Sequence, residues 1–259
     1  AAENNSYDKL LYLATKFPEL LNELDRYGNT PLHSAAKNAA RRTLKLLLKY
    51  NLDPNAVNVR GYTPLHLCIM SNAVFRDDCC LYMLERGFDE DIDAPEGKTT
   101  LLLACEHGRS VIARQLIRNG MDPTVPALNG LTCLQAACSQ GLLPLVLDLI
   151  ENHADVTAPG YCGTFPLHDC IASANVEIAH ALFNNGAYVN VVEPYYNQTP
   201  LMWACQAGVA ELVRLYILQG AKIEAVDYQK RTAAHFAAIS DSVDVYNLLR
   251  EADANFDVV

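Results

Sequence analysis

Short apolar blocks of two kinds alternate along the chain. One kind is rich in small residues, mainly alanine and cysteine, as at residues 34–36, and the other carries leucine, isoleucine and valine at spacings of three and four, as at residues 209–217. Such spacings place apolar side chains on one face of a helix. The pattern predicts pairs of helices. The small side chains of the first helix allow close approach to its neighbours, and the large side chains of the second fill the core.

A four-residue segment precedes each pair. Thr30-Pro31-Leu32-His33 recurs at residues 63–66 and, in degraded form, five more times. A threonine before a proline suits a helix N-terminus, because its hydroxyl accepts a hydrogen bond from a free amide and proline needs no acceptor there. We expect helices to begin near the threonine position of each copy, which falls at residues 30, 63, 99, 132, 165, 199 and 232.

A second signal marks the end of each pair. Glycine stands 21 to 24 residues after the threonine position in four copies, and we expect it to end the second helix in the left-handed conformation. The residues concerned are Gly87, Gly120, Gly186 and Gly220, with Asn51, His153 and Asp253 at the same place in the other copies. Asparagine and aspartate tolerate that conformation better than histidine does.

The turn segment, the two helices and the glycine loop together resemble the ankyrin repeat over nearly the whole chain. The resemblance implies an all-α solenoid of helix-turn-helix units with β-hairpin-like loops, in a single elongated domain, 1–259. Residues 1–24 form a partial or capping repeat, in which 7–16 is the second helix, and seven full repeats follow. Their bounds are 25–57, 58–93, 94–126, 127–159, 160–193, 194–226 and 227–259. Neither end carries a clear polar cap, so we expect a segment of a longer protein.

Two copies are longer than the others, with three extra residues near 71–78 and one extra residue in the loop 193–197. Insertions in repeat proteins fall in loops and often on the working face. At the first insertion we favour neutral drift, since exposed loops tolerate changes of length.

Composition narrows the setting. The chain has nine cysteines, an odd number, and five of them stand where the repeat needs a small buried residue, which favours reduced thiols in a cytoplasmic and/or nuclear protein. No apolar run reaches the length of a membrane span, and the N-terminus lacks the pattern of a signal peptide. A net charge of −10 disfavours direct contact with nucleic acid. We expect a monomer that does not insert into membranes.

Catalytic and metal-binding patterns are not found in the sequence. The resemblance implies that His33, His66, His168 and His235, each the fourth residue of its turn segment, bridge neighbouring loops. No Cys-x-x-Cys pair and no glycine-rich phosphate loop occurs. In the segment His168-Asp169-Cys170, adjacent helical residues point in different directions, and the repeat explains both His168 and Cys170, so a catalytic role is disfavoured. We therefore predict a protein that is not an enzyme and needs neither metal nor cofactor.

The resemblance also implies where a partner binds, since ankyrin stacks hold other proteins along the loop tips, or fingers, and the exposed side of the first helices. Tyrosine recurs at these tips, and tyrosine and tryptophan give large contact area at low entropic cost. Trp203, the only tryptophan, is the best single anchor, beside Tyr195 and Tyr196. The predicted partner-binding residues are Tyr27, Arg60, Tyr62, Lys98, Leu128, Tyr161, Tyr195, Tyr196, Trp203, Tyr228 and Arg231.

The charges on the fingers suggest the chemistry of the partner. Central fingers are apolar or aromatic, whereas the outer ones carry Arg26, Arg60, Lys98, Lys230 and Arg231. We expect a protein or extended peptide with an apolar centre and acidic flanks, bound by a non-catalytic module of a larger scaffold or adaptor protein.

Two other functions stay open. The chain is alternatively the substrate-recognition or targeting arm of a larger enzyme, such as a ubiquitin ligase adaptor. A less favoured alternative is a sensor of a small ligand, in which a nucleotide stacks on Trp203 beside Arg231. The resemblance further implies asparaginyl hydroxylation, for which Asn55 and Asn190 occupy the loop position concerned.

Overall fold

The computed structural model describes residues 2–255. Its helices fall in two compact units, Ala1–Asp122 and Pro123–Val259, and each unit is described by itself. The first contains α1 (Ala2–Lys16), η1 (Pro18–Asn22), α2 (Pro31–Lys37), α3 (Arg41–Leu47), η2 (Leu48–Tyr50), α4 (Pro64–Met70), α5 (Arg76–Leu84), η3 (Pro95–Gly97), α6 (Thr100–Glu106) and α7 (Ser110–Arg118). The second contains α8 (Cys133–Ser139), α9 (Leu143–Glu151), η4 (Tyr161–Gly163), α10 (Pro166–Ser173), α11 (Val176–Asn184), α12 (Pro200–Ala207), α13 (Ala210–Leu218), α14 (Ala233–Ser240) and α15 (Val243–Glu251).

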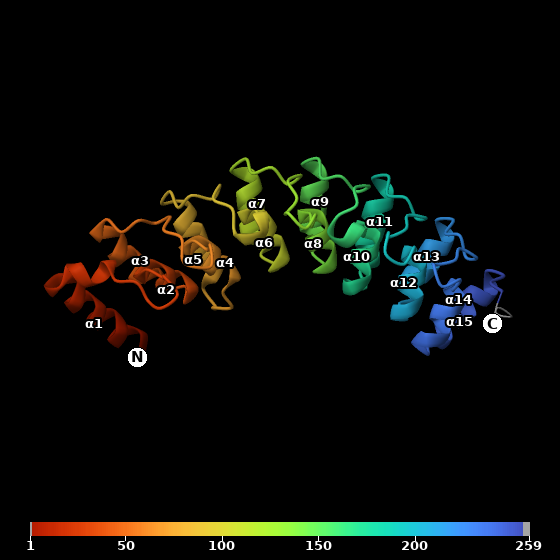
Figure 1. The fold of residues 1–259 in the computed structure, drawn as a ribbon, viewed down its shortest axis with the longest axis horizontal. Coiled ribbons are helices and arrows are strands. Elements are labelled where there is room, and N and C mark those ends of the chain that lie inside the picture. The colour runs from red at the N-terminus through yellow and green to blue at the C-terminus, as the bar shows by residue number, and fades with distance from the viewer. Residues whose placement is uncertain (1, 256–259) are drawn as a thin grey trace. The chain divides into compact units, whose positions relative to one another are not determined.

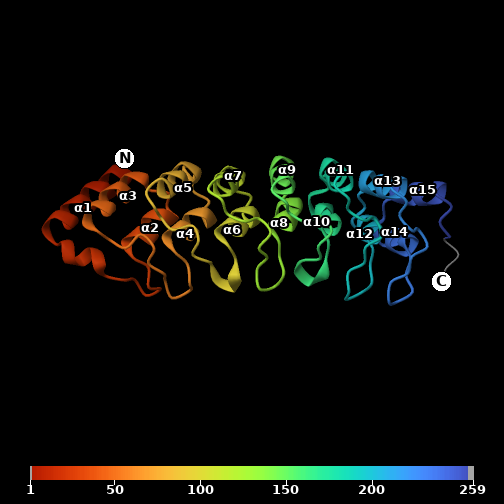
Figure 2. The ribbon, with the colours of Figure 1, turned by 90° about the horizontal axis from the view of Figure 1, so that it is seen from above.

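The helices of each unit form two rows. In the first unit α2, α4 and α6 are successive inner helices, and α3, α5 and α7 form the outer row, with α1 beside α3 (Figures 1 and 2). In the second unit α8, α10, α12 and α14 are the inner helices, and α9, α11, α13 and α15 lie outside them. Over residues 2–255 no strand is present, and the fingers contribute one isolated antiparallel bridge, between Ala94 and Lys98. The expected all-α ankyrin-type solenoid architecture is confirmed.

The inner helices begin where the turn segment predicts. Each starts one residue after the threonine position, at residues 31, 64, 100, 133, 166, 200 and 233. The hydroxyl of Thr99, for example, accepts the amide of Leu102 at 3.1 Å. Phe165 has no hydroxyl at this position, and its own amide donates to Nδ1 of His168 at 3.3 Å. The helix start therefore survives the loss of the threonine.

Of the four motif histidines, His33 and His168 join neighbouring fingers as predicted. His66 instead meets the hydroxyl of Thr100 at 3.1 Å, and His235 bonds to Thr232 of its own repeat. Nδ1 of His33 accepts the amide of Thr30, so Nε2 carries the proton and donates to the carbonyl of Tyr62 at 3.0 Å. His168 makes the equivalent bond to the carbonyl of Gln198 at 3.2 Å. Burial lowers the pKa of His66 and of His168 to about 4, so both rings are neutral at pH 7 and act as fixed structural bridges.

The ends of the outer helices also follow the sequence signal. The four predicted glycines have φ angles between 77° and 102°, the left-handed region that glycine adopts without strain. Asn51, His153 and Asp253 adopt the same region, with φ of 54°, 71° and 60°. Histidine is the least suited of the three to that backbone, so the fourth repeat tolerates local strain at this turn.

The cysteines at the small-residue position are core residues. Cys68, Cys105, Cys138, Cys170 and Cys205 are fully buried, and all nine cysteines are free thiols. Burial raises the pKa of Cys205 to about 12, which keeps its thiol protonated and unreactive at neutral pH.

One inner helix interface contains a carboxyl group. In the fourth repeat Gln135 takes the place of the motif histidine, and its Nε2 donates to Oδ2 of Asp169 at 2.7 Å and to the carbonyl of Thr164 at 3.0 Å. Burial between α8 and α10 raises the pKa of Asp169 to about 7, despite these hydrogen bonds. A carboxyl group that is harder to ionise in the folded state destabilises the fold as pH rises.

The first prediction concerns this carboxyl group. Asp169 is largely neutral in the folded and the unfolded state below about pH 4. The free energy of unfolding that it removes grows as pH rises from there to its folded pKa near 7. Three pKa units correspond to at most about 4 kcal/mol, and partial solvent contact reduces this. We expect Asp169→Asn to be more stable than wild type at pH 8 and equal to it at pH 4, by urea unfolding.

A control of opposite sign is available in the same unit. Hydrogen bonds from Thr157 lower the pKa of Asp155, so Asp155→Asn should lose stability at pH 8. An Asp169→Asn gain of the same size at both pH values contradicts the assignment.

Candidate functional site

The only tryptophan lies on the inner row of the second unit. Trp203 is half-buried on α12, with its ring edge-on to His168 of α10 at a centroid distance of 5.0 Å and an angle of 73°. Its Nε1 is buried and has no hydrogen-bond partner within residues 2–255. A buried donor without an acceptor costs about 1–3 kcal/mol. The indole N–H is therefore an unsatisfied donor buried within the inner row.

An open hollow of about 410 Å³ lies beside this ring. Its walls come from two fingers and the inner helices α12 and α14, and are formed by Tyr196, Gln198, Trp203, Gln206, Arg231, Phe236 and Ile239. Three predicted partner-binding residues, Tyr196, Trp203 and Arg231, thus line one site. The sequence did not single out Phe236 or Ile239, which are a buried and an exposed apolar residue of α14.

The cation of this hollow is already paired within the chain. Nη2 of Arg231 lies 2.8 Å from Oδ2 of Asp227, and its guanidinium stands over the ring of Phe236 at 4.6 Å. Burial alone would raise the pKa of Asp227, but hydrogen bonds from Arg231, Gln198 and Gln229 outweigh it and lower the pKa. The pair leaves the hollow mainly apolar and aromatic.

A buried glutamate shapes the finger that carries the paired tyrosines. Glu193 is 2% exposed, and its carboxylate accepts the amides of Tyr195 at 2.7 Å, Tyr196 at 3.0 Å and Gln198 at 3.0 Å. These bonds fix the backbone of a turn whose two tyrosines, Tyr195 and Tyr196, are 66% and 58% exposed. The extra residue of this copy therefore lies in an ordered turn. The carbonyl of Tyr196 also accepts the amide of Tyr228 at 2.9 Å, which ties this finger to the next.

The other predicted residues of the second unit are exposed finger residues. Leu128, Tyr161 and Tyr228 are 86%, 49% and 66% exposed, and none of them lines the hollow. Tyr195 stands on the same finger as Tyr196 but outside the lining of the hollow. Their role in binding stays a prediction.

The predicted residues of the first unit differ in exposure and in whether another residue already pairs with them. Tyr27 is exposed, and the guanidinium groups of Arg26 and Arg60 lie 4.6 and 5.6 Å from its ring. Tyr62 is half-buried, with its ring 6.3 Å from that of His66, so it packs against the helix of its own repeat. Nζ of Lys98 lies 3.0 Å from Glu106, and that carboxylate neutralises a charge that the sequence suggested was free.

Both candidate hydroxylation residues support the following repeat. Oδ1 of Asn55 accepts the amide of Asp89 at 2.9 Å. Oδ1 of Asn190 accepts the amide of Lys222 at 2.8 Å, and its Nδ2 donates to the carbonyl of Gly220 at 3.2 Å. The structural role of the two side chains is thus the same, and hydroxylation stays a prediction.

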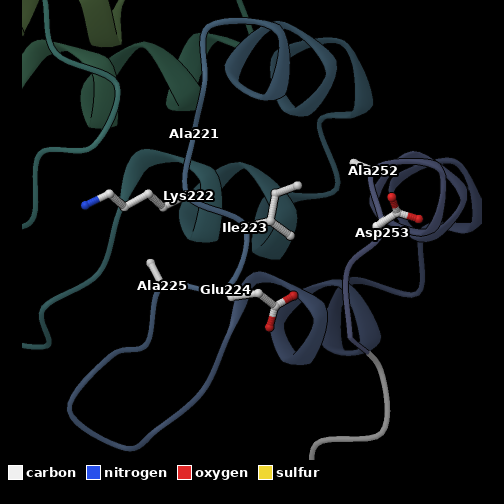
Figure 3. Close-up of a pocket in the computed structure, with 7 residues that line it drawn as sticks. All are labelled: Ala221, Lys222, Ile223, Glu224, Ala225, Ala252 and Asp253. Atoms are coloured by element: carbon white, nitrogen blue, oxygen red, sulfur yellow. The ribbon is translucent and has the colours of Figure 1, made fainter.

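A larger hollow, of about 500 Å³, lies between residues 221–225 and the end of α15 (Figure 3). Lys222 extends away from Asp253, and Ile223 lies between them (Figure 3). The polar side chains of this hollow therefore do not converge on one point, as a specific ligand site requires.

Within residues 2–255 no group of three or more His, Cys, Asp or Glu side chains is placed to hold a metal ion. No helix in this range is both long and apolar enough to cross a membrane.

Family models described as ankyrin repeats match residues 75–160, 112–193 and 167–259, and a second such model matches 12–68. The crystal structure of the human ASB11 ankyrin repeat domain superposes with a TM-score of 0.76 at 22% identity, covering 88% of this chain and 99% of that one.

Longer curated proteins contain similar segments. The chain is 27% identical over 219 residues to the transient receptor potential cation channel subfamily A member 1 of Homo sapiens. The aligned segment covers 81% of this chain and 16% of the channel. It is 42% identical over 76 residues to the E3 ubiquitin-protein ligase XBAT33 of Arabidopsis thaliana. This aligned segment covers 29% of this chain and 15% of the ligase. The chain thus spans about a sixth of the length of these relatives.

The second prediction concerns the tyrosine finger. Glu193→Ala removes the acceptor of three amides, and an unpaired amide costs roughly 1–3 kcal/mol, so we expect hydrogen exchange at Tyr195, Tyr196 and Gln198 to accelerate by about tenfold or more. The exchange rates are measured by NMR or mass spectrometry. Glu211→Ala, at an exposed position of α13, is the control and should leave this finger unchanged. Equal exchange in the two variants contradicts the role of Glu193.

Proposed function

Because the chain belongs to the ankyrin-repeat family, we propose that it is a non-catalytic protein-binding module that holds a partner protein or an extended peptide along its fingers and inner helices. Ankyrin repeats are protein-interaction folds and typically carry no catalytic chemistry. The observation that supports this site best is the open hollow beside Trp203, whose lining is mainly apolar and aromatic.

The chemistry of the hollow indicates what enters it. Phe236 and Ile239 favour an aliphatic or aromatic side chain, because its transfer from water contributes about 25 cal/mol per Å². The exposed side-chain amide of Gln206, also in the lining, can hydrogen-bond a main-chain carbonyl next to that side chain. An extended peptide supplies both groups within one or two residues. Tyr195 and Tyr196 then border the contact with rings whose backbone Glu193 holds in place.

The proposed acidic flanks of the partner rest on fewer cations than the sequence suggests. Arg231 and Lys98 are paired with Asp227 and Glu106, so they add little attraction for an incoming acid. Lys230 is exposed at its finger tip in the second unit, and Arg26 and Arg60 are exposed around Tyr27 in the first. We propose an apolar centre as the main determinant and acidic residues as secondary contacts.

A second candidate is the recognition arm of a larger enzyme. It is favoured by the similarity of short segments to two plant ubiquitin ligases, XBAT33 of Arabidopsis thaliana and the probable ligase XBOS33 of Oryza sativa. In that case the chain still only binds, and the reaction belongs to another part of the protein. Binding of a nucleotide is less favoured, because Asp227 already holds Arg231, the one cation among the described residues that line the hollow. The free thiols support a cytoplasmic and/or nuclear location.

The third prediction tests the hollow beside Trp203. We expect the triple variant Tyr195→Ala, Tyr196→Ala, Trp203→Ala to lose, by more than about tenfold, proteins that the wild-type chain retains from cell extract, since central aromatic residues each contribute about 2 kcal/mol or more at interfaces. Retention is measured by quantitative mass spectrometry. A titration of a purified retained partner should also shift the fluorescence of Trp203, the only tryptophan.

The matched control is the pair Tyr12→Ala, Tyr188→Ala, which removes exposed tyrosines that do not line the hollow. Circular dichroism establishes that both variants are folded. Equal retention by the triple variant and by the control, with no change in Trp203 fluorescence, would place binding on another surface.

A further inference from the structure

The positive charge of the chain is unevenly distributed. The net charge is −10, yet residues 26–52 contain no aspartate or glutamate. The six cations of this segment are Arg26, Lys37, Arg41, Arg42, Lys45 and Lys49. Four of them lie on α3 and η2 in the outer row of the first unit, on the other layer from the inner helices (Figure 2). An acidic protein therefore presents one strongly basic outer helix.

Three cations meet on one aromatic ring at this place. Tyr82 of α5 is 6% exposed, and its ring has Arg41 at 4.8 Å, Lys45 at 5.3 Å and Arg86 at 5.3 Å. Each contact with the ring is favourable, but the three like charges repel one another. We call Arg41, Lys45, Tyr82 and Arg86 the basic cluster.

The acids of the chain compensate this cluster only in part. Both carboxylate oxygens of Asp78 accept from Nη1 of Arg41, and the nearby Glu85 adds to the rise in the pKa of Arg41 that Asp78 causes. Within residues 2–255 neither Lys45 nor Arg86 forms an ion pair, and both are exposed. Nε of Arg41 is buried and has no hydrogen-bond partner there. The cluster thus has two free charges and an unused donor.

We propose that the basic cluster, on the outer face of α3 and α5, docks an acidic segment of a partner protein. Carboxylates of aspartate or glutamate would pair with Lys45 and Arg86 and relieve the repulsion over Tyr82. This surface lies on the outer row and does not depend on the hollow beside Trp203.

The surroundings favour a narrow polypeptide over a broad anionic surface. The segment after α5 carries Asp89, Glu90, Asp91 and Asp93, and Asp53 follows η2. A membrane of anionic lipid would face these carboxylates as well as the cations, and the repulsion acts over the screening length of about 8 Å in physiological salt. A single extended acidic chain reaches the cluster without covering its acidic neighbours.

The fourth prediction uses a fluorescein-labelled decaglutamate peptide as the probe, with fluorescence anisotropy at low salt. We expect Lys45→Glu with Arg86→Glu to weaken binding by about tenfold or more, and the neutral pair Lys45→Gln with Arg86→Gln to weaken it less. Glu85→Gln removes a competing acid and should tighten binding about twofold.

The matched control carries the same change of net charge in the second unit. Lys222→Glu with Arg250→Glu reverses two exposed cations, and we expect its affinity to stay within about twofold of wild type. Equal losses in the two reversed variants would mean that only net charge matters, which overturns the proposal.

Other anions are separate arms of the experiment. Phosphatidylserine vesicles and a single-stranded oligonucleotide should bind more weakly than decaglutamate, and inorganic phosphate should compete only weakly with it. The choice of a polypeptide is overturned if decaglutamate does not bind while vesicles or the oligonucleotide do, and if Lys45→Glu with Arg86→Glu abolishes that binding. The Trp203 triple variant should bind decaglutamate as wild type does.

Discussion

The structure depends on the fact that no repeat covers its own apolar face. Each pair of helices leaves leucine, valine or isoleucine side chains that only the next pair can bury, so stability comes from the contacts between neighbours. The hydrogen bond from a motif histidine to the next finger fixes how neighbours meet, because it joins a buried ring to a main-chain carbonyl of the following repeat. Apolar burial has no direction, whereas this bond does, and it aligns the fingers at the two junctions formed by His33 and His168.

The same constraint explains why variation at the motif position changes the interface between neighbouring repeats. Gln135 reaches the finger of the next repeat as a histidine would, but its amide also meets Asp169, and the repeat therefore contains a carboxyl group that is hard to ionise. In the sixth repeat Met202 stands at this position and offers only a weak sulfur acceptor to Thr199 at 3.5 Å. The neighbouring Trp203 is also the residue whose N–H is unpaired. Departures from the motif thus change the local hydrogen bonding, by adding a buried carboxyl partner at Gln135 and by weakening the acceptor at Met202.

Sequence reasoning succeeded where one residue decides the geometry. A threonine hydroxyl begins an inner helix and a left-handed glycine ends an outer one, and each acts within four residues of its own position. It could not predict the lining of the hollow, since Phe236 and Ile239 reach Trp203 only through the spacing of successive repeats. Lys98 looked like a free finger charge for the same reason: Glu106 is eight residues away and meets it only after α6 has formed. Glu193 became informative only when its carboxylate was seen to close the finger.

The two candidate surfaces differ in the physical term that would carry recognition. The hollow beside Trp203 is apolar and its one cation is neutralised by Asp227, so affinity there would come from burial and from one hydrogen bond, with little dependence on salt. The basic cluster around Tyr82 is charged and partly uncompensated, so recognition there would be fast, specific for acids and weakened by salt. A repeat protein can keep both terms because the two surfaces lie on different helix pairs, one on inner helices and the other on outer helices. The net negative charge of the remaining chain repels anions in general. An anion can therefore bind favourably only at the basic outer helix.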